Sequence, residues 1–163
     1  MPDLLDTINL AKVRHGAQMY GDKPYMYHIL GVLTKFINHP VYFTLPEELR
    51  NDIVFAIVLH DTLEDTPTTE QELLTMGYSV RCVRFVKLVT RKPEDNMTYM
   101  EKIDFLVASG EVGAMLVKFF DNVFNQEHCF NYPDDPKYNK LALRYMRSMN
   151  RIRKGLATHG IDI

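Results

Sequence analysis

Apolar residues along this chain recur mainly every three or four positions, which is the spacing of an amphipathic α-helix. The pattern predicts eight helices, at residues 3–20, 25–38, 46–66, 69–76, 79–90, 97–108, 111–127 and 137–157. A Thr-x-x-Glu capping box at residues 69–72 and glycines or prolines in the intervening turns mark several of the helix ends. Residues 41–44 form the one strand-like run and are expected to be an extended connector. The prediction is an all-α fold of seven or eight helices, in a single domain over residues 1–163.

The predicted third helix changes from apolar to polar within one turn. Residues 53–59 are entirely apolar, and they are followed by His60, Asp61, Glu64 and Asp65. On a continuous helix His60 and Glu64 lie four residues apart, as do Asp61 and Asp65, so these groups share a face. Carboxylates are rarely buried without a compensating partner. A divalent metal ion would supply that compensation, and this stretch is therefore predicted to hold one.

Two other polar groups interrupt apolar helices and are candidates to complete a metal site. These are His28 and Asp121, and Asn125 follows Asp121 by one helical turn. Taken alone, His28 is typical of a packed histidine, and Asp121 of a carboxylate paired with a lysine. With His60 and Asp61 they form a set of two nitrogen and two oxygen ligands, which suits Mn²⁺, Fe²⁺ or Zn²⁺ better than Ca²⁺.

Such a site predicts hydrolysis of a phosphate bond. A bound ion lowers the pKa of its water and polarises phosphorus. Glu64 is then expected to position or deprotonate that water, or to protonate the leaving group.

Several short motifs resemble one known family. Residues 60–66 read HDTLEDT, which resembles the HDxxEDT motif of the RelA/SpoT-type hydrolase domain, a branch of the HD phosphohydrolase superfamily. Residues 15–18 resemble that family's HxGQ segment, residues 24–28 its PYxxHP segment, and residues 117–125 its VKLADxxxN segment. The resemblance is strongest over residues 8–125 and includes the small stand-alone alarmone hydrolases.

The resemblance implies an HD-domain bundle around a metal-binding cleft, with a specific reaction. Metal-activated water would remove the 3′-pyrophosphate of ppGpp or pppGpp, the nucleotides of the stringent response. The implied Mn²⁺ ligands are His28, His60, Asp61 and Asp121. The implied catalytic pair is Glu64 and Asp65, and Asn125 is an implied substrate or supporting contact.

The chain departs from the family where the substrate is recognised. Met19 and Tyr20 follow Gln18, where the family has Arg or Lys, and Ile29 replaces the proline after His28. Tyr20 is a candidate to stack on a nucleotide base, or else to pack within the protein, and Arg14 is a candidate to restore the lost charge.

Two cations of the predicted last helix, Lys140 and Arg144, are further candidates to reach the cleft. Because the family's Arg or Lys is missing after Gln18, another phosphorylated nucleotide, such as NADPH, a dNTP or a cyclic nucleotide, is an alternative substrate. A non-catalytic nucleotide-binding protein and a purely structural helical protein are the remaining alternatives.

Composition excludes some partner classes and leaves others open. The formal net charge is −2, from 19 basic and 21 acidic residues, which argues against a general nucleic-acid binder. No apolar run approaches the ~20 residues that span a membrane, and no secretory signal is evident. Cys82 and Cys129 suggest no disulfide framework, so a cytoplasmic setting is expected. The oligomeric state stays open.

Overall fold

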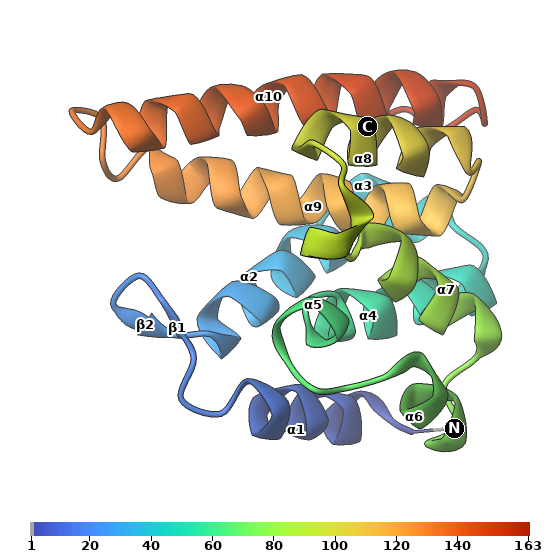
Figure 1. Ribbon diagram of the computed structural model, residues 1–163. Coiled ribbons are helices and arrows are strands. Elements are labelled where there is room, and N and C mark those ends of the chain that lie inside the picture. Colours follow the sequence, from blue (N-terminus) through green and yellow to red (C-terminus); the bar gives the residue numbers. More distant parts are fainter. Residues whose placement is uncertain (1) are drawn as a thin grey trace.

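The computed structural model describes residues 2–163, apart from the side chain of Pro93, and within them the fold is mostly helical (Figure 1). This confirms the predicted all-α class. The helices are α1 (Leu4–His15), α2 (Met26–Ile37), α3 (Pro40–Thr44), α4 (Glu47–Leu59), α5 (Thr62–Asp65), α6 (Glu70–Thr75), α7 (Val80–Val89), α8 (Tyr99–Ala108), α9 (Val112–Cys129) and α10 (Pro136–Ala157). The remaining elements are the strands β1 (Met19–Tyr20) and β2 (Lys23–Pro24) and a 3₁₀ turn, η1 (Pro93–Asp95).

Helix α9 runs through the middle of the molecule and contacts helices on opposite sides. It packs against α10 along much of its length, and against α2, α4 and α7 on the other side (Figure 1). Most of its apolar positions are buried, among them Ala114, Leu116, Val117 and Phe120. Burial on several sides gives α9 the broad apolar surface of a central helix rather than a single stripe. It also carries Asp121 into the interior.

The first helix is shorter than predicted, and a hairpin replaces its last turn. Helix α1 ends at His15 because Gly16 adopts a positive φ of 53°, a conformation that glycine tolerates and most residues avoid. Strands β1 and β2 then pair antiparallel, with Tyr20 opposite Lys23. The expected helix over residues 3–20 was therefore wrong in its last five positions.

Residues 41–44 were predicted to be an extended connector and instead belong to helix α3. Pro40 occupies the first turn of that helix, and the His39 side chain accepts a hydrogen bond from the backbone N–H of Val41. Proline suits the first turn because its missing N–H has no intrahelical partner there. The proline in the first turn and the cap at His39 favour a helix, although residues 41–44 have a strand-like composition.

The predicted helix over residues 46–66 is divided at His60 and Asp61 into α4 and α5. The imidazole Nδ1 of His60 lies 2.7 Å from the carbonyl oxygen of Ile57, and the Thr62 hydroxyl donates to Leu59 O at 2.7 Å. These side chains occupy carbonyls of the last turn of α4, which a continuing helix would use. The break places His60 and Asp61 at a corner between two helices.

A glycine in α2 lets that helix approach α9 closely. A Cβ atom at Gly31 would overlap the ring of Phe124, which packs directly on the α2 backbone. This contact sets the distance between the helix that carries His28 and the helix that carries Asp121. No helix among residues 2–163 combines the length and apolar character needed to cross a membrane.

Candidate metal centre and active site

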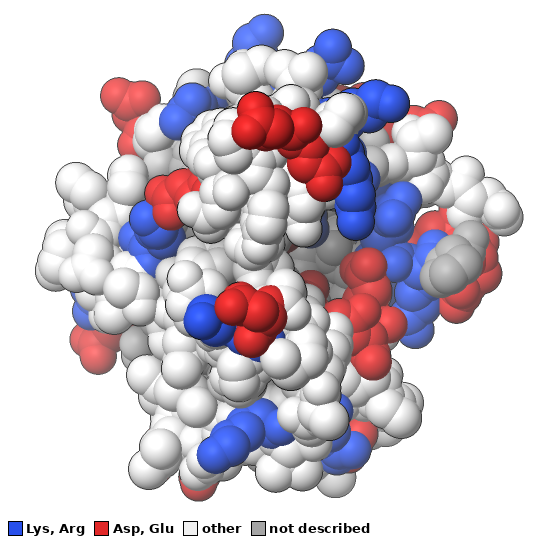
Figure 2. All heavy atoms as spheres, turned by 90° about the vertical axis from the view of Figure 1, so that its left-hand side faces the viewer, with Lys and Arg blue, Asp and Glu red and all other residues white. Residues whose placement is uncertain are grey.

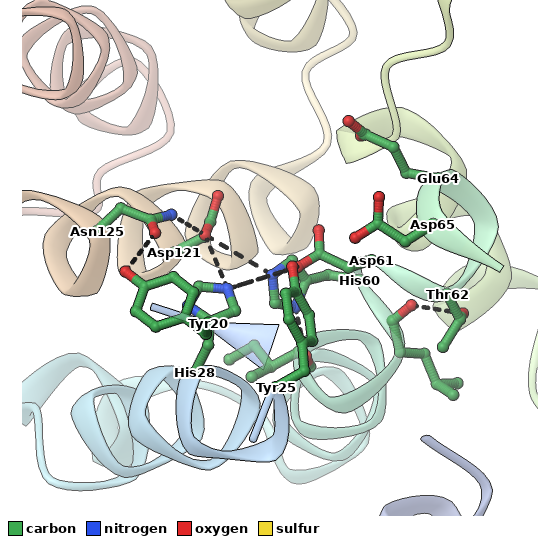
Figure 3. A network of polar contacts seen from close by, with 12 residues as sticks. Tyr20, Tyr25, His28, His60, Asp61, Thr62, Glu64, Asp65, Asp121 and Asn125 are labelled. Atoms are coloured by element: carbon green, nitrogen blue, oxygen red, sulfur yellow. Dashed lines mark hydrogen bonds and ion pairs between the residues drawn. The ribbon is translucent and has the colours of Figure 1, made fainter. Parts of the chain in front are cut away.

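Four side chains predicted to hold a metal ion meet at one point in the interior (Figure 3). The Nε2 atoms of His28 and His60 lie 3.2 Å apart. Oδ1 of Asp121 lies 3.3 Å from the first of these nitrogens and 3.7 Å from the second. Oδ2 of Asp61 lies 2.9 Å from Nε2 of His60 and 3.4 Å from Nε2 of His28. Helices α2 and α9 thus contribute one group each, and the α4–α5 corner contributes two, His60 and Asp61.

The two carboxylates of this cluster are held in the ionised form. Burial by itself would raise the pKa of Asp61, but the adjacent His60 imidazole holds that pKa well below the usual range. Burial likewise acts against ionisation of Asp121, and the Lys118 ammonium group lowers its pKa well below the usual range. Ionised carboxylates are the form that binds a cation.

Neighbouring side chains fix the orientation of these groups. Lys118 Nζ donates to Oδ2 of Asp121 at 2.8 Å, and Asn125 Nδ2 donates to its Oδ1 at 2.5 Å. The Tyr25 hydroxyl donates to Oδ2 of Asp61 at 2.6 Å. Such contacts are typical of metal sites, where a second layer of hydrogen bonds orients the ligands.

The donor set fits a divalent transition metal ion. Ligand atoms of His28, His60 and Asp121 all lie within 4.8 Å of one another, and all three residues are buried. Asp61 is outside this tightest group, although its carboxylate contacts both imidazoles. Two imidazole nitrogens with carboxylate oxygens suit Mn²⁺, Fe²⁺ or Zn²⁺. The distances and burial are therefore compatible with a metal site built from these residues.

Glu64 and Asp65 lie beside the cluster on the short helix α5. Oε2 of Glu64 accepts a hydrogen bond from the backbone N–H of Arg91 at 2.8 Å, and burial raises the Glu64 pKa. Oδ2 of Asp65 accepts from Gln18 Nε2 at 2.9 Å. Glu64 lines the same cavity as His28, Asp61 and Asp121, whereas Asp65 lines a neighbouring pocket that it shares with Glu64 and Arg91. The two residues of the predicted catalytic pair therefore line adjoining pockets, and Glu64 lines both.

The cavity over the cluster has a volume of about 240 Å³ and is rich in cations. The basic residues on its wall are Arg91, Lys102, Lys118 and Arg144. The Arg144 guanidinium carbon lies 4.3 Å above the centre of the Tyr99 ring and 5.2 Å from that of Tyr145. Among the described residues no carboxylate forms an ion pair with Arg144. Its charge is thus held by aromatic rings and faces the cavity.

Seen from the side of the hairpin, the molecular surface is hollowed near its centre, and basic and acidic side chains both border the hollow (Figure 2). The sequence prediction did not include Lys102, Lys118, Tyr99 or Tyr145 on the cavity wall. Lys118 had a detectable signal, because it is a lone charge inside the apolar run of α9. Lys102 and the two tyrosines had none, since exposed helix faces commonly carry such residues.

The other predicted substrate contacts have different outcomes. Arg14 forms an ion pair with Glu72 on α6, and Lys140 is exposed; neither residue lines the cavity. Asn125 lines it. Tyr20 does not lie on its wall: its ring stacks on His28, with a centroid distance of 4.8 Å.

Comparisons with known proteins relate the chain to one group of hydrolases. No established family profile matches the chain. It is 36% identical over 90 residues to the guanosine-3′,5′-bis(diphosphate) 3′-pyrophosphohydrolase MESH1 of Danio rerio, covering 53% of this chain and 46% of the relative. It is 34% identical over 131 residues to MESH1 of Homo sapiens, covering 75% of this chain and 66% of the relative. The chain belongs to the HD-domain hydrolases. Within them it resembles the RelA/SpoT-type hydrolase domain, as its motifs predicted.

The fold agrees with this relationship. A solved structure described as "A metazoan ortholog of SpoT hydrolyzes ppGpp and plays a role in starvation responses" superposes with a TM-score of 0.64. The match covers 98% of each chain at 16% sequence identity, which supports the shared fold alone. The chain spans 46% and 66% of the lengths of the two curated relatives.

Proposed function

We propose that this chain is a metal-dependent nucleotide pyrophosphohydrolase that removes the 3′-pyrophosphate of ppGpp or pppGpp. The observation that carries the proposal is the buried group of His28, His60 and Asp121, with Glu64 on the wall of the same cavity. The named activity of the two curated relatives supports this choice of substrate. A single domain over residues 1–163 is part of the proposal.

The proposed metal ligands are His28, His60, Asp61 and Asp121, and Mn²⁺ is the proposed ion. A divalent ion bound at this position would supply a water of lowered pKa and would polarise the phosphorus that is attacked. The ionised carboxylates of Asp61 and Asp121 would balance the charge of the ion. Glu64 accepts a proton from the attacking water or returns one to the leaving oxygen. Asp65, bonded to Gln18, lies beside Glu64, and its proximity is one of the causes that raise the Glu64 pKa.

Cations on the cavity wall are the proposed phosphate contacts. Arg144 is the strongest of these, because its guanidinium faces the cavity without a carboxylate partner among residues 2–163. Lys102 and the backbone of Arg91 lie on the same wall. Arginine binds phosphate oxygens through paired N–H donors, which favours a fixed orientation of the substrate. Asn125 is proposed to support Asp121, to which it donates a hydrogen bond.

One observation favours another phosphorylated nucleotide as the alternative substrate. The hairpin after Gln18 carries Met19 and Tyr20, where the family has a cation, and Tyr20 is packed on His28. A nucleotide that needs no cation at this point would then be accepted, such as NADPH, a dNTP or a cyclic nucleotide.

A substrate screen tests the proposal. Purified protein with Mn²⁺ is incubated with ppGpp, NADPH, dNTPs and cyclic nucleotides, and the released products are identified. We expect pyrophosphate from ppGpp. The variant Glu64→Ala is expected to lose about 10²- to 10⁴-fold in rate, the usual contribution of a general acid or base, while still binding Mn²⁺. Cleavage of another nucleotide with ppGpp left intact would refute the proposed substrate, and binding without turnover would indicate a non-catalytic nucleotide-binding protein.

A cytoplasmic setting is also proposed, since Cys82 and Cys129 are both free and buried. Fractionation of cells that express the tagged chain tests this location.

A further inference from the structure

The two histidines of the metal cluster are oriented by different means. The His60 ring is fixed by the contact of its Nδ1 with the carbonyl oxygen of Ile57 at 2.7 Å. The Nδ1 atom of His28 is buried and has no hydrogen-bond partner among the described residues. A metal-binding histidine usually donates its second ring N–H to a fixed acceptor, which holds the plane of the ring. The orientation of His28 therefore depends on packing.

Tyr20 is the aromatic residue that covers the face of His28. The two rings are nearly parallel, with a centroid distance of 4.8 Å and an interplanar angle of 19°. Tyr25 and Phe124 also lie near His28, but at interplanar angles of 58° and 67°. Rings set at such angles do not stack on the imidazole, whereas the Tyr20 ring lies nearly parallel to it and restricts rotation of its plane (Figure 3).

The hydroxyl of Tyr20 reaches a second part of the same centre. It donates to Oδ1 of Asn125 at 2.8 Å, and Nδ2 of Asn125 donates to Oδ1 of Asp121 at 2.5 Å. This chain of bonds fixes which end of the Asn125 amide faces Asp121. Burial raises the pKa of Tyr20, so its hydroxyl remains a donor.

The hairpin holds Tyr20 in this position. Tyr20 is paired with Lys23 across the two short strands, and Gly21 between them has a positive φ of 61°. The ring of His128 at the end of α9 packs against Tyr20 from another side, with a centroid distance of 4.6 Å. Tyr20 is thus half-buried, with aromatic rings packed on it, and it does not lie on the cavity wall.

We propose that Tyr20 is a positioning residue of the metal centre, which holds the plane of the His28 imidazole with its ring and orients Asn125 toward Asp121 with its hydroxyl. This role differs from the base-stacking role expected from the sequence. The inference rests on the proposed function for its kinetic consequences, but its effect on metal binding can be measured without a substrate.

The experiment separates the two contacts with two variants and a matched control. Tyr20→Leu removes the ring that covers His28, and Tyr20→Phe removes only the hydroxyl. Tyr27→Phe is the control, because Tyr27 adjoins His28 in sequence but is 52% exposed. The dissociation constant of Mn²⁺ is measured on metal-free protein from the paramagnetic resonance signal of the free ion. The kcat and KM for ppGpp are measured at saturating Mn²⁺.

Tyr20→Leu is expected to weaken Mn²⁺ binding by about tenfold or more, within the range of 10- to 100-fold found for residues that orient metal ligands. Tyr20→Phe is expected to lower kcat several-fold while KM stays unchanged, and Tyr27→Phe should match the unmodified protein in both respects. Circular dichroism shows whether Tyr20→Leu folds. If it does not, the kcat and KM of Tyr20→Phe alone test the inference.

Unchanged Mn²⁺ affinity in a folded Tyr20→Leu variant would overturn the inference, as would a rise in KM alone, which would mean that Tyr20 contacts the substrate. A protein that binds Mn²⁺ normally but does not cleave ppGpp would refute the proposed function instead. In that case the Mn²⁺ dissociation constants still decide the role of Tyr20.

Discussion

The carboxyl group of Glu64 has an environment suited to proton transfer. Burial is the main reason that its pKa is raised, and the nearby charges of Asp61 and Asp65 raise it further. The backbone N–H of Arg91 and the charge of Lys118 act in the opposite direction without cancelling the shift. A general acid or base works best when its pKa approaches the working pH, so this shift favours catalysis.

The raised pKa predicts how activity depends on pH. Glu64 accepts a proton only when it is ionised, so kcat at saturating Mn²⁺ should fall as the pH is lowered through its pKa. We expect this acid limb above the ordinary glutamate value of 4.5. Initial rates of pyrophosphate release across the acidic range measure it. The slow residual rate of Glu64→Gln should lack the limb, and an identical limb in that variant would assign it to protonation of the metal ligands.

Residue spacing was sufficient to predict the centre of the site but not its surroundings. His60 and Asp61 stand out because their polar groups follow seven apolar residues without a break. Arg14 had no such signal, and its actual partner Glu72 is 58 positions away. Pairing of this kind depends on the docking of α1 against the segment around α6, which periodicity does not reveal.

Close approach of α2 and α9 makes a prediction at the level of elements. An alanine in place of glycine within a helix ordinarily stabilises it by roughly 0.5–1 kcal/mol. At Gly31 the added methyl group would overlap Phe124, so Gly31→Ala should instead lower the free energy of unfolding by about 1–3 kcal/mol. Urea unfolding followed by circular dichroism measures the change. A more stable variant would show that Phe124 moves aside without cost.

Helix ends were predictable where a side chain caps them. The hydroxyls of Thr69 and Ser79 accept hydrogen bonds from backbone N–H groups three residues later, and α6 and α7 begin within one residue of the predicted positions. The division between α4 and α5 was missed because it arises from His60 and Thr62 bonding to carbonyls of the preceding turn. Apolar periodicity continues across this corner and gives no sign of it.

At the scale of the whole molecule, one central helix connects otherwise separate parts. Helix α9 packs against α10 on one side and against α2, α4 and α7 on the other (Figure 1). The metal cluster takes its groups from α2, from α9 and from the corner between α4 and α5. Because Asp121 and His28 are 93 positions apart, their meeting requires the complete fold. Metal binding should therefore be linked to global stability.

This linkage predicts that Mn²⁺ stabilises the folded protein. An ion that binds only the folded state at 100 times its dissociation constant adds about 2.7 kcal/mol. For a chain of this size that corresponds to a rise in Tm of roughly 5–10 °C, which calorimetry with and without Mn²⁺ measures. Asp121→Asn keeps the shape of the side chain but removes the charge that faces both histidines. The rise should disappear in that variant, whereas an equal rise in both proteins would mean that Mn²⁺ binds at another position.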